Sequence, residues 1–201
     1  MQLREYQQVA VDAVWRDLFT QQGNPILVAP TGSGKSPMIG SLCQTAIEKY
    51  QGRVIVLAHR KELLEQNAEK IRAFLPPSIP VGLYSAGLKR SQTDQPVICA
   101  GIQSVHKKAG LFGSRQLVLV DEAHLVPDDG EGMYRTFIND LREINPKLRI
   151  VGLTATPYRT GSGSLCRPDA IFQRVCHETQ VKQLIDDGWL CKLTTSLGEA
   201  S

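Results

Sequence analysis

Short, nearly continuous apolar runs alternate along the chain with segments whose apolar residues recur at helical spacing. Strands are predicted at residues 26–28, 53–58, 81–84, 96–100, 116–120 and 148–153. Apolar runs of this kind are typical of parallel strands that are covered on both faces. Helices are predicted at residues 3–19, 38–50, 60–74, 102–106, 133–144 and 181–187. Strands that alternate with helices predict right-handed βαβ units, and therefore an α/β fold with a mostly parallel sheet.

The remaining segments are predicted to be connections. Residues 21–25 end the first helix, and the polar residues 89–95 indicate a loop. A flexible loop is expected at residues 161–164, Gly188 is expected to close the last helix, and residues 190–195 are predicted as a further strand.

Composition adds limits on size and compartment. The 201 residues fit one domain, and 42% hydrophobic with 21% charged residues is typical of a globular protein. A net charge of +3 is compatible with a nucleic-acid partner and does not demonstrate one. Five cysteines, an odd number without framework spacing, favour a reducing compartment. With neither a signal segment nor a membrane-spanning run, the protein is expected in the cytoplasm.

One group of possible metal ligands lies toward the C-terminus. It consists of Cys166, Cys176, His177 and Cys191. Since these residues lack a Cys-x-x-Cys spacing, the sequence disfavours a structural zinc site there.

A glycine-rich segment, Ala29–Ser36, lies between the first strand and the following helix. Strand, glycine-rich turn and Gly-Lys-Ser at a helix start are the context of a phosphate-binding loop. Gly32 and Gly34 shape the loop, Lys35 can reach the β- and γ-phosphates, and the Ser36 hydroxyl can ligate Mg²⁺. Ala29 replaces the glycine that usually opens this pattern. The alternative is a glycine-rich turn with a solvated lysine.

Two acidic residues, Asp121 and Glu122, follow the apolar run at residues 116–120. The carboxyl edge of a parallel sheet is where open α/β folds bind ligands. Asp121 is placed to hold Mg²⁺ opposite Ser36, and Glu122 to orient or deprotonate an attacking water. The alternative, a solvated acidic turn, is disfavoured by the phosphate loop upstream.

These segments resemble the conserved motifs of superfamily 2 helicases and translocases. Asp121–His124 resembles the DEAH form of motif II, Ala29–Ser36 motif I and Thr154–Thr156 motif III. Residues 57–63 resemble motif Ia, residues 101–105 the Thr-x-x-Gln-Ser motif with Ala100 in place of Thr, and residues 3–7 the adenine-reading segment. The resemblance covers residues 3–159, and residues 86–90 and 152–159 are most similar to the RadD-like branch of bacterial DNA-repair helicases.

The resemblance implies a RecA-like P-loop NTPase domain that uses ATP and Mg²⁺. The implied nucleotide-binding residues are Arg4, Gln7, Thr31, Gly32, Ser33, Gly34, Lys35 and Ser36. The implied catalytic residues are Lys35, Asp121, Glu122 and His124, and the implied metal ligands are Ser36 and Asp121. Nucleic-acid contacts are implied for Arg60, Gln103 and Ser104, and coupling of the two sites for His124, Thr154 and Thr156.

Three of these roles have plain structural alternatives. Gln7 could be a solvated helix residue, Arg60 and Lys61 an ordinary polar helix start, and His124 a residue that only packs or caps locally.

The resemblance also implies a domain organisation. Residues 1–178 are expected to form the RecA-like domain, and residues 179–201 the start of a linker toward a second RecA-like domain. Superfamily 2 motors bind ATP between two such domains, so we expect this chain to bind nucleotide, to hydrolyse it slowly and not to unwind duplexes. The expected function is the motor domain of a DNA helicase or translocase in repair or recombination. An RNA helicase, a restriction-type translocase and a non-catalytic interaction module remain alternatives.

Overall fold

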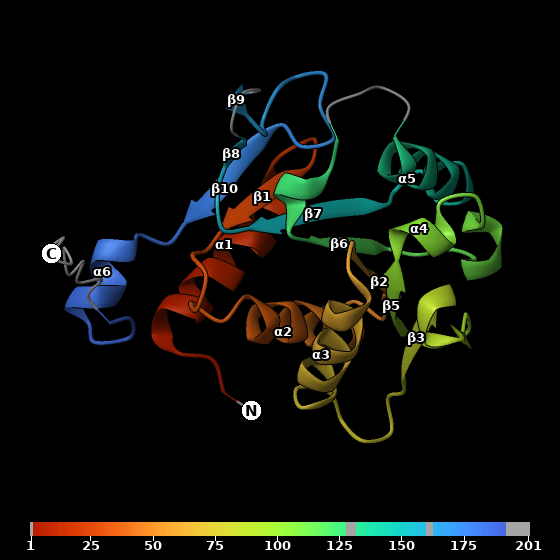
Figure 1. Cartoon of the computed structure of the whole chain (residues 1–201), viewed down its shortest axis with the longest axis horizontal. Helices are drawn as coiled ribbons and strands as arrows, with labels where there is room; N and C mark the ends of the chain where they lie inside the picture. The colour runs from red at the N-terminus through yellow and green to blue at the C-terminus, as the bar shows by residue number, and fades with distance from the viewer. Residues whose placement is uncertain (1, 128–131, 160–162, 192–201) are drawn as a thin grey trace, which may run out of the picture.

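An eight-stranded sheet forms the centre of the molecule, in the order β10-β1-β7-β6-β2-β5-β3-β4 (Figure 1). The computed structural model describes residues 2–127, 132–159 and 163–191. The strands are β1 Pro25–Val28, β2 Val54–Ala58, β3 Val81–Ser85, β4 Arg90–Ser91, β5 Val97–Gly101, β6 Leu117–Asp121, β7 Arg149–Thr154 and β10 Arg174–Glu178. Every neighbouring pair is parallel except β3 and β4, which confirms the predicted mostly parallel sheet.

Helices cover both faces of this sheet (Figure 1). They are α1 Glu5–Thr20, α2 Lys35–Glu48, α3 Lys61–Arg72, α4 Ile102–Val105, α5 Met133–Ile144 and α6 Val181–Asp186. Residues of α1, α2 and α3 form one apolar cluster with the sheet, and residues of α4 and α5 form the other. Neighbouring residues of one strand alternate between the clusters, with Leu119 in the first and Val118 and Val120 in the second. This alternation explains why the strands are continuously apolar in sequence.

The strands predicted before residue 154 and the predicted helices are present, with ends that shift by a few residues. All residues of β1, β2, β3, β5 and β6 are buried. The helix predicted from Met38 begins three residues earlier, at Lys35, which places Pro37 in its first turn. A proline in the first turn loses no helical hydrogen bond, because those N–H groups lack intrahelical partners.

Two of the predicted loops contain short strands. Arg90–Ser91, inside the loop predicted at residues 89–95, is β4 and pairs antiparallel with β3. Gly163–Ser164, inside the loop predicted at 161–164, is β9 and pairs with β8, Tyr158–Arg159. Backbone hydrogen bonds hold both pairs together. Segments of two mostly polar residues show no apolar pattern, so the sequence does not predict them as strands. Of the strand predicted at 190–195, residues 190 and 191 are not in a strand, and 192–195 lie outside the described residues.

Strand β10 was missed by the sequence prediction, and it is the edge strand next to β1. Its sequence, Arg-Val-Cys-His-Glu, is mostly polar and no residue in it is fully buried. Arg174 pairs with Asp17 of α1, and its Nε donates to Asp17 Oδ2 at 2.7 Å. Asn24 and Gln173 exchange backbone and side-chain hydrogen bonds ahead of the strand. Polar contacts to α1 and the preceding turn therefore hold β10 in place.

The described residues contain neither a membrane-spanning helix nor a cluster of metal ligands. None of the described helices combines the length and apolarity needed to cross a membrane. Within residues 2–127, 132–159 and 163–191, no three His, Cys, Asp or Glu side chains are grouped as a metal site would require, and this includes Cys166, Cys176, His177 and Cys191.

Candidate nucleotide site and nucleic-acid groove

The phosphate loop leaves the carboxyl end of β1 and enters α2 at Lys35. Gly32 and Gly34 adopt left-handed backbone conformations, with φ of +83° and +85°. A Cβ atom on Gly34 would collide with the side-chain amide of Gln7. Only glycine fits position 34 without strain, as expected for a loop that turns its N–H groups toward an anion. Thr31 at the tip of the loop is exposed.

Two residues of α1 hold the loop by its buried residue Ser33. Tyr6 Oη and Gln7 Nε2 each donate to the Ser33 carbonyl oxygen at 2.8 Å. Gln7 Oε1 accepts a hydrogen bond from the Arg4 backbone N–H at 2.9 Å. Gln7 is only 5% exposed, so the alternative of a solvated helix residue is wrong. The bracing role of Tyr6 was not predicted, because nothing in the local pattern separates it from an ordinary core tyrosine.

A hollow beside the loop, here called the base hollow, is lined by Gln2, Arg4, Gln7, Gly32, Ser33, Gly34 and Pro37. It brings together the residues for which an adenine contact was predicted, next to the loop that would hold the phosphates. Adenine recognition by Arg4 and Gln7 stays a prediction.

Lys35 faces the acidic pair across the loop. Its Nζ lies 3.6 Å from Glu122 Oε1 and 3.4 Å from the Ala29 carbonyl oxygen. The solvated-lysine alternative is therefore wrong, because the Lys35 side chain is 11% exposed and is directed at Glu122.

Asp121 ends β6 and is almost completely buried, at 5% exposure. Burial raises the pKa of its carboxyl group; the hydrogen bond from Asn67 lowers it, the nearby charge of Glu122 raises it, and Lys35 lowers it. Asn67 Nδ2 donates to Asp121 Oδ2 at 2.8 Å. A buried carboxylate beside a second carboxylate is an environment that favours a bound cation.

Asn67 is a site residue that the sequence prediction missed. It is 2% exposed and lies on α3 among the buried residues Leu64, Ala68 and Ile71. The signal was available, because a polar side chain on the apolar stripe of a helix needs a buried partner. The partner could not be named without the fold, since Asp121 is 54 residues away in the chain.

Glu122 connects the loop to the next strand through His124. It adopts a left-handed conformation, with φ of +51°, which is uncommon for a non-glycine residue. His124 Nδ1 lies 3.3 Å from Glu122 Oε2 and 3.0 Å from Thr154 Oγ1. Thr154 Oγ1 in turn donates to the Thr156 carbonyl oxygen at 3.0 Å. His124 therefore joins motif II to motif III, so the alternative of purely local packing is wrong.

The predicted metal ligands come from two elements, α2 and β6. Ser36 lies in the first turn of α2, and Asp121 lies at the end of β6. In the sheet, β7 separates β6 from β1, the strand that leads into the phosphate loop. A hydroxyl and a carboxylate are oxygen donors that suit Mg²⁺. The donor set and the cradle of the loop fit a magnesium nucleotide.

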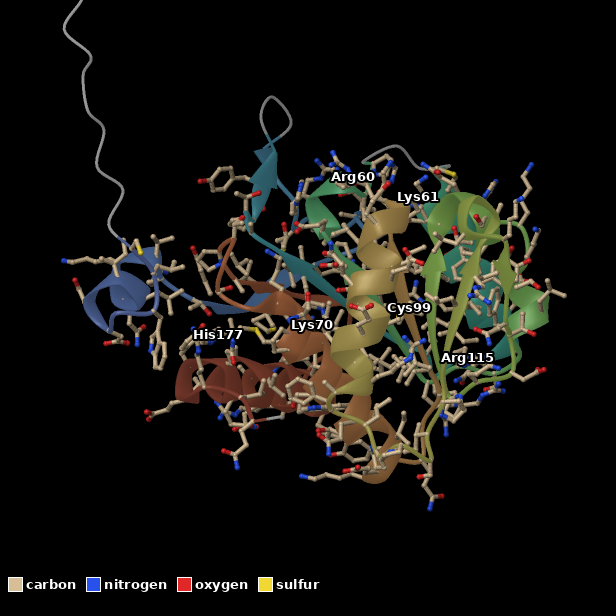
Figure 2. The ribbon with its side chains drawn as sticks, turned by 60° about the horizontal axis from the view of Figure 1, so that its bottom comes forward. Arg60, Lys61, Lys70, Cys99, Arg115 and His177 are labelled. Carbon is tan, nitrogen blue, oxygen red and sulfur yellow. The ribbon has the colours of Figure 1, made fainter. Side chains whose placement is uncertain are left out.

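A second hollow, here called the groove, opens beside the ends of β2 and β5. It is lined by His59, Arg60, Lys61, Glu62, Leu64, Ser85, Gly87, Gly101, Gln103 and Ser104. Arg60 and Lys61 lie together at the start of α3, far from Arg115 (Figure 2). Gln103 is exposed, and Ser104 Oγ accepts a hydrogen bond from the Ala86 N–H at 3.0 Å. The structure thus brings together all three residues predicted to contact nucleic acid.

A third hollow lies between the nucleotide site and the groove. Its lining includes Thr31, Arg60, Glu122, His124 and Thr156. Arg60 lines both this hollow and the groove. One arginine therefore borders the two regions, which a simple polar helix start would not require.

Comparisons with known proteins match this architecture. The family ResIII, described as "Type III restriction enzyme, res subunit", matches residues 1–159. IRC3 of Saccharomyces cerevisiae, named as a candidate ATP-dependent helicase, is 26% identical over 203 residues, covering 94% of this chain and 28% of its own length. The ATP-dependent RNA helicase DHX58 of Mus musculus is 27% identical, covering 82% of this chain and 26% of its own length.

A solved structure supports the same fold. The nuclease-deletion mutant of the Type ISP restriction-modification enzyme LlaGI, solved with a DNA substrate mimic, superposes with a TM-score of 0.72 at 16% identity, covering 94% of this chain and 21% of that chain. Both curated relatives are about four times longer than the stretch that this chain matches.

The family match extends over most of the chain and contains the phosphate loop, the acidic pair and the Thr154–Thr156 segment. The chain therefore belongs to the ResIII family and carries the N-terminal RecA-like motor domain of a superfamily 2 helicase.

Proposed function

We propose that this chain is the ATP-hydrolysing part of a nucleic-acid motor, acting on DNA. The observation that carries the proposal is the placement of Lys35, Asp121 and Glu122 around one loop, with Glu122 tied to Thr154 through His124. A binding module would need the loop alone, whereas hydrolysis also needs the acidic pair.

Each residue has a defined task in this proposal. Lys35 neutralises charge on the β- and γ-phosphates, and the loop N–H groups hold the phosphate chain. Bound Mg²⁺, held by Ser36 and Asp121, would neutralise further charge on the phosphates. Glu122 orients the attacking water and accepts its proton. Its contact with Lys35 fixes the carboxylate at the phosphate loop before a nucleotide arrives.

The link to nucleic acid runs through motif III and the groove. A change at Glu122 reaches Thr154 and Thr156 through His124. Arg60 stands where the third hollow meets the groove, in position for a backbone phosphate. Phosphate contacts of this kind give affinity without sequence preference.

DNA is favoured over RNA by the family description, which is that of a restriction enzyme, and by the DNA substrate mimic in the LlaGI complex. DHX58 keeps an RNA substrate as the second candidate. A role in repair, as in the RadD-like branch, rests on the resemblance of residues 86–90 and 152–159 alone.

The domain boundary belongs to the same proposal. Residues 1–178 form the motor domain, and residues 179–201 begin the linker to a second RecA-like domain. The last strand of the main sheet along the described chain ends at Glu178, and α6 beyond it still packs against the motor domain through the buried Leu184.

Steady-state ATP hydrolysis tests the proposal, measured without nucleic acid and with single-stranded DNA, duplex DNA or RNA of matched sequence. We expect hydrolysis that DNA stimulates more than RNA does. Glu122→Gln should abolish turnover but keep ATP binding, because the amide fills the same space without accepting a proton. Lys35→Ala should lose both.

Turnover that persists in Glu122→Gln would exclude Glu122 as the base. A wild-type chain that binds ATP without hydrolysing it, with or without nucleic acid, would favour the non-catalytic module. Stronger stimulation by RNA would assign the second candidate substrate.

A further inference from the structure

The segment that follows the sheet returns to the nucleotide site. Helix α6 ends at Asp186, and Gly188 has a φ of +75° that turns the chain back. The N–H groups of Trp189 and Leu190 both donate to the Leu184 carbonyl oxygen, at 2.7 and 2.9 Å. Since Leu184 is fully buried in the core, this turn has a fixed position.

Trp189 packs against two residues of the predicted adenine-reading segment. Arg4 Cζ lies 4.3 Å from the centroid of the Trp189 ring. The Tyr6 ring centroid lies 6.2 Å away, with the two planes inclined at 49°. Both distances are within the range of favourable cation–π and aromatic contacts.

Leu190 brings the same turn to the phosphate loop. A Cβ atom on Gly32 would lie 3.2 Å from Leu190 Cδ2, and Leu190 is partly buried against the core. The segment 189–190 therefore touches both the loop and the residues beside it.

We propose that Trp189 is a positioning residue that holds the Arg4 guanidinium in place for the nucleotide base. This inference rests on the proposed function. Arg4 lines the base hollow and its guanidinium contacts the Trp189 ring and the Tyr6 hydroxyl, so residues on one side of the hollow set where this side chain lies. A guanidinium held in place in this way can stack on a base or donate hydrogen bonds to it.

The energetic effect is preorganisation. A free arginine side chain loses rotamer freedom when it is ordered by a ligand, and that loss weakens binding. Contact with Trp189 orders Arg4 before the nucleotide arrives. Because Arg4 would contact the base, Trp189 should not affect the affinity for ligands that consist only of a phosphate chain.

Calorimetric titration with Mg·ADP and with Mg·tripolyphosphate separates the contribution of the base to binding from that of the phosphate chain. Trp189→Ala should weaken ADP binding about two- to fivefold, in line with the strength of a cation–π contact between exposed side chains, and leave tripolyphosphate binding unchanged. Trp189→Phe keeps an aromatic face and should bind ADP within about twofold of wild type. Trp15 contacts Phe19 and Tyr50 instead, so Trp15→Phe should change neither.

Fluorescence gives a second readout without disturbing the contact. Trp15 and Trp189 are the two tryptophans, so Trp15→Phe leaves Trp189 as the reporter. ADP should change its emission, and tripolyphosphate should not.

Unchanged ADP affinity in Trp189→Ala, an equal loss of both ligands, or Trp189 emission that ignores ADP would each overturn the positioning role. Wild-type protein that binds tripolyphosphate but not ADP would also overturn it. Wild-type protein that binds neither ligand would contradict the proposed function itself, and the role of Trp189 with it.

Discussion

The carboxyl group of Asp121 is destabilised in its charged form by the fold that presents it. Because burial raises its pKa above the ordinary value of 3.8, the folded protein binds this proton more tightly than the unfolded chain does. At a pH below both pKa values the carboxyl group is protonated in both states and does not lower the free energy of unfolding. As pH rises through the pKa of the unfolded chain and then that of the folded protein, ionisation of Asp121 lowers the free energy of unfolding.

Asp121→Asn removes this titration and tests its sign. We expect the stability of the variant relative to wild type to increase as pH rises from about 4 to 7. Urea denaturation of both proteins at several pH values measures the difference, in which the other titrating groups cancel. A difference that stays constant over this range would show that Asp121 is not destabilised when charged.

Thr154 is a fully buried hydroxyl residue, and its side chain serves two partners. It contacts His124 Nδ1 at 3.0 Å and donates to the Thr156 carbonyl oxygen at 3.0 Å. Thr154→Val keeps the shape and removes the hydroxyl, and with it both hydrogen bonds of this buried side chain.

Thr154→Val should lower the free energy of unfolding by about 1–3 kcal/mol. It should also reduce the stimulation of ATP hydrolysis by nucleic acid, with ADP affinity retained. Thermal denaturation and ATPase assays measure the two effects. Thr20→Val, an exposed threonine with one local hydrogen bond, is the matched control and should change neither. Full stimulation in Thr154→Val would exclude its coupling role.

At the scale of elements, one buried arginine joins the connection before β6 to that before β5. Arg115 is 1% exposed and donates to the carbonyl oxygens of Phe112, Gln95, Pro96 and Thr93. It lies at the amino end of the sheet, away from Arg60 (Figure 2). Burial lowers the pKa of its guanidinium to about 10, and the group stays charged at neutral pH.

Arg115→Lys should destabilise the protein by about 3 kcal/mol, because an ammonium cannot reproduce the fork that bonds several carbonyl groups at once. Thermal or urea denaturation checks this. Arg53→Lys is the control. The Arg53 Nη2 donates to the Asp94 carbonyl oxygen at 3.0 Å at an exposed position, so this variant should cost under about 1 kcal/mol. Equal losses in the two variants would refute the clamp.

The interior strands of the sheet could be predicted from the sequence, and the edge strand β10 could not. A strand such as β6 is buried on both faces, so its residues are all apolar and its end is marked by Asp121. Strand β10 is held by Arg174 and by backbone bonds, which leave no apolar period to detect. Edge strands are polar because a long apolar edge would pair with other chains.

The same division holds within the site. Lys35, Asp121 and Glu122 could be predicted because nucleotide chemistry fixes their types and order. Asn67 and Tyr6 could not be assigned their partners, because those contacts join segments that only the fold brings together.

At the scale of the whole molecule, the chain covers about a quarter of its curated relatives. We predict that adding a second RecA-like domain raises the ATPase rate by orders of magnitude, since an arginine finger stabilises transition-state charge about 10³–10⁵-fold. Steady-state ATPase assays of the chain alone and of the extended protein check this. Equal rates would refute the need for a second domain.

The place of β10 also bears on how this protein can be shortened. The family match ends at Arg159, yet β1 has β10 as its outer neighbour. A protein cut at Arg159 would present the bare backbone of Pro25–Val28, an apolar tetrapeptide, to other molecules. We predict that it self-associates in size-exclusion chromatography, whereas a protein cut after Trp189 stays monomeric. Strand β10, which would prevent this self-association by covering β1, therefore lies outside residues 1–159, the part of the chain that matches the family.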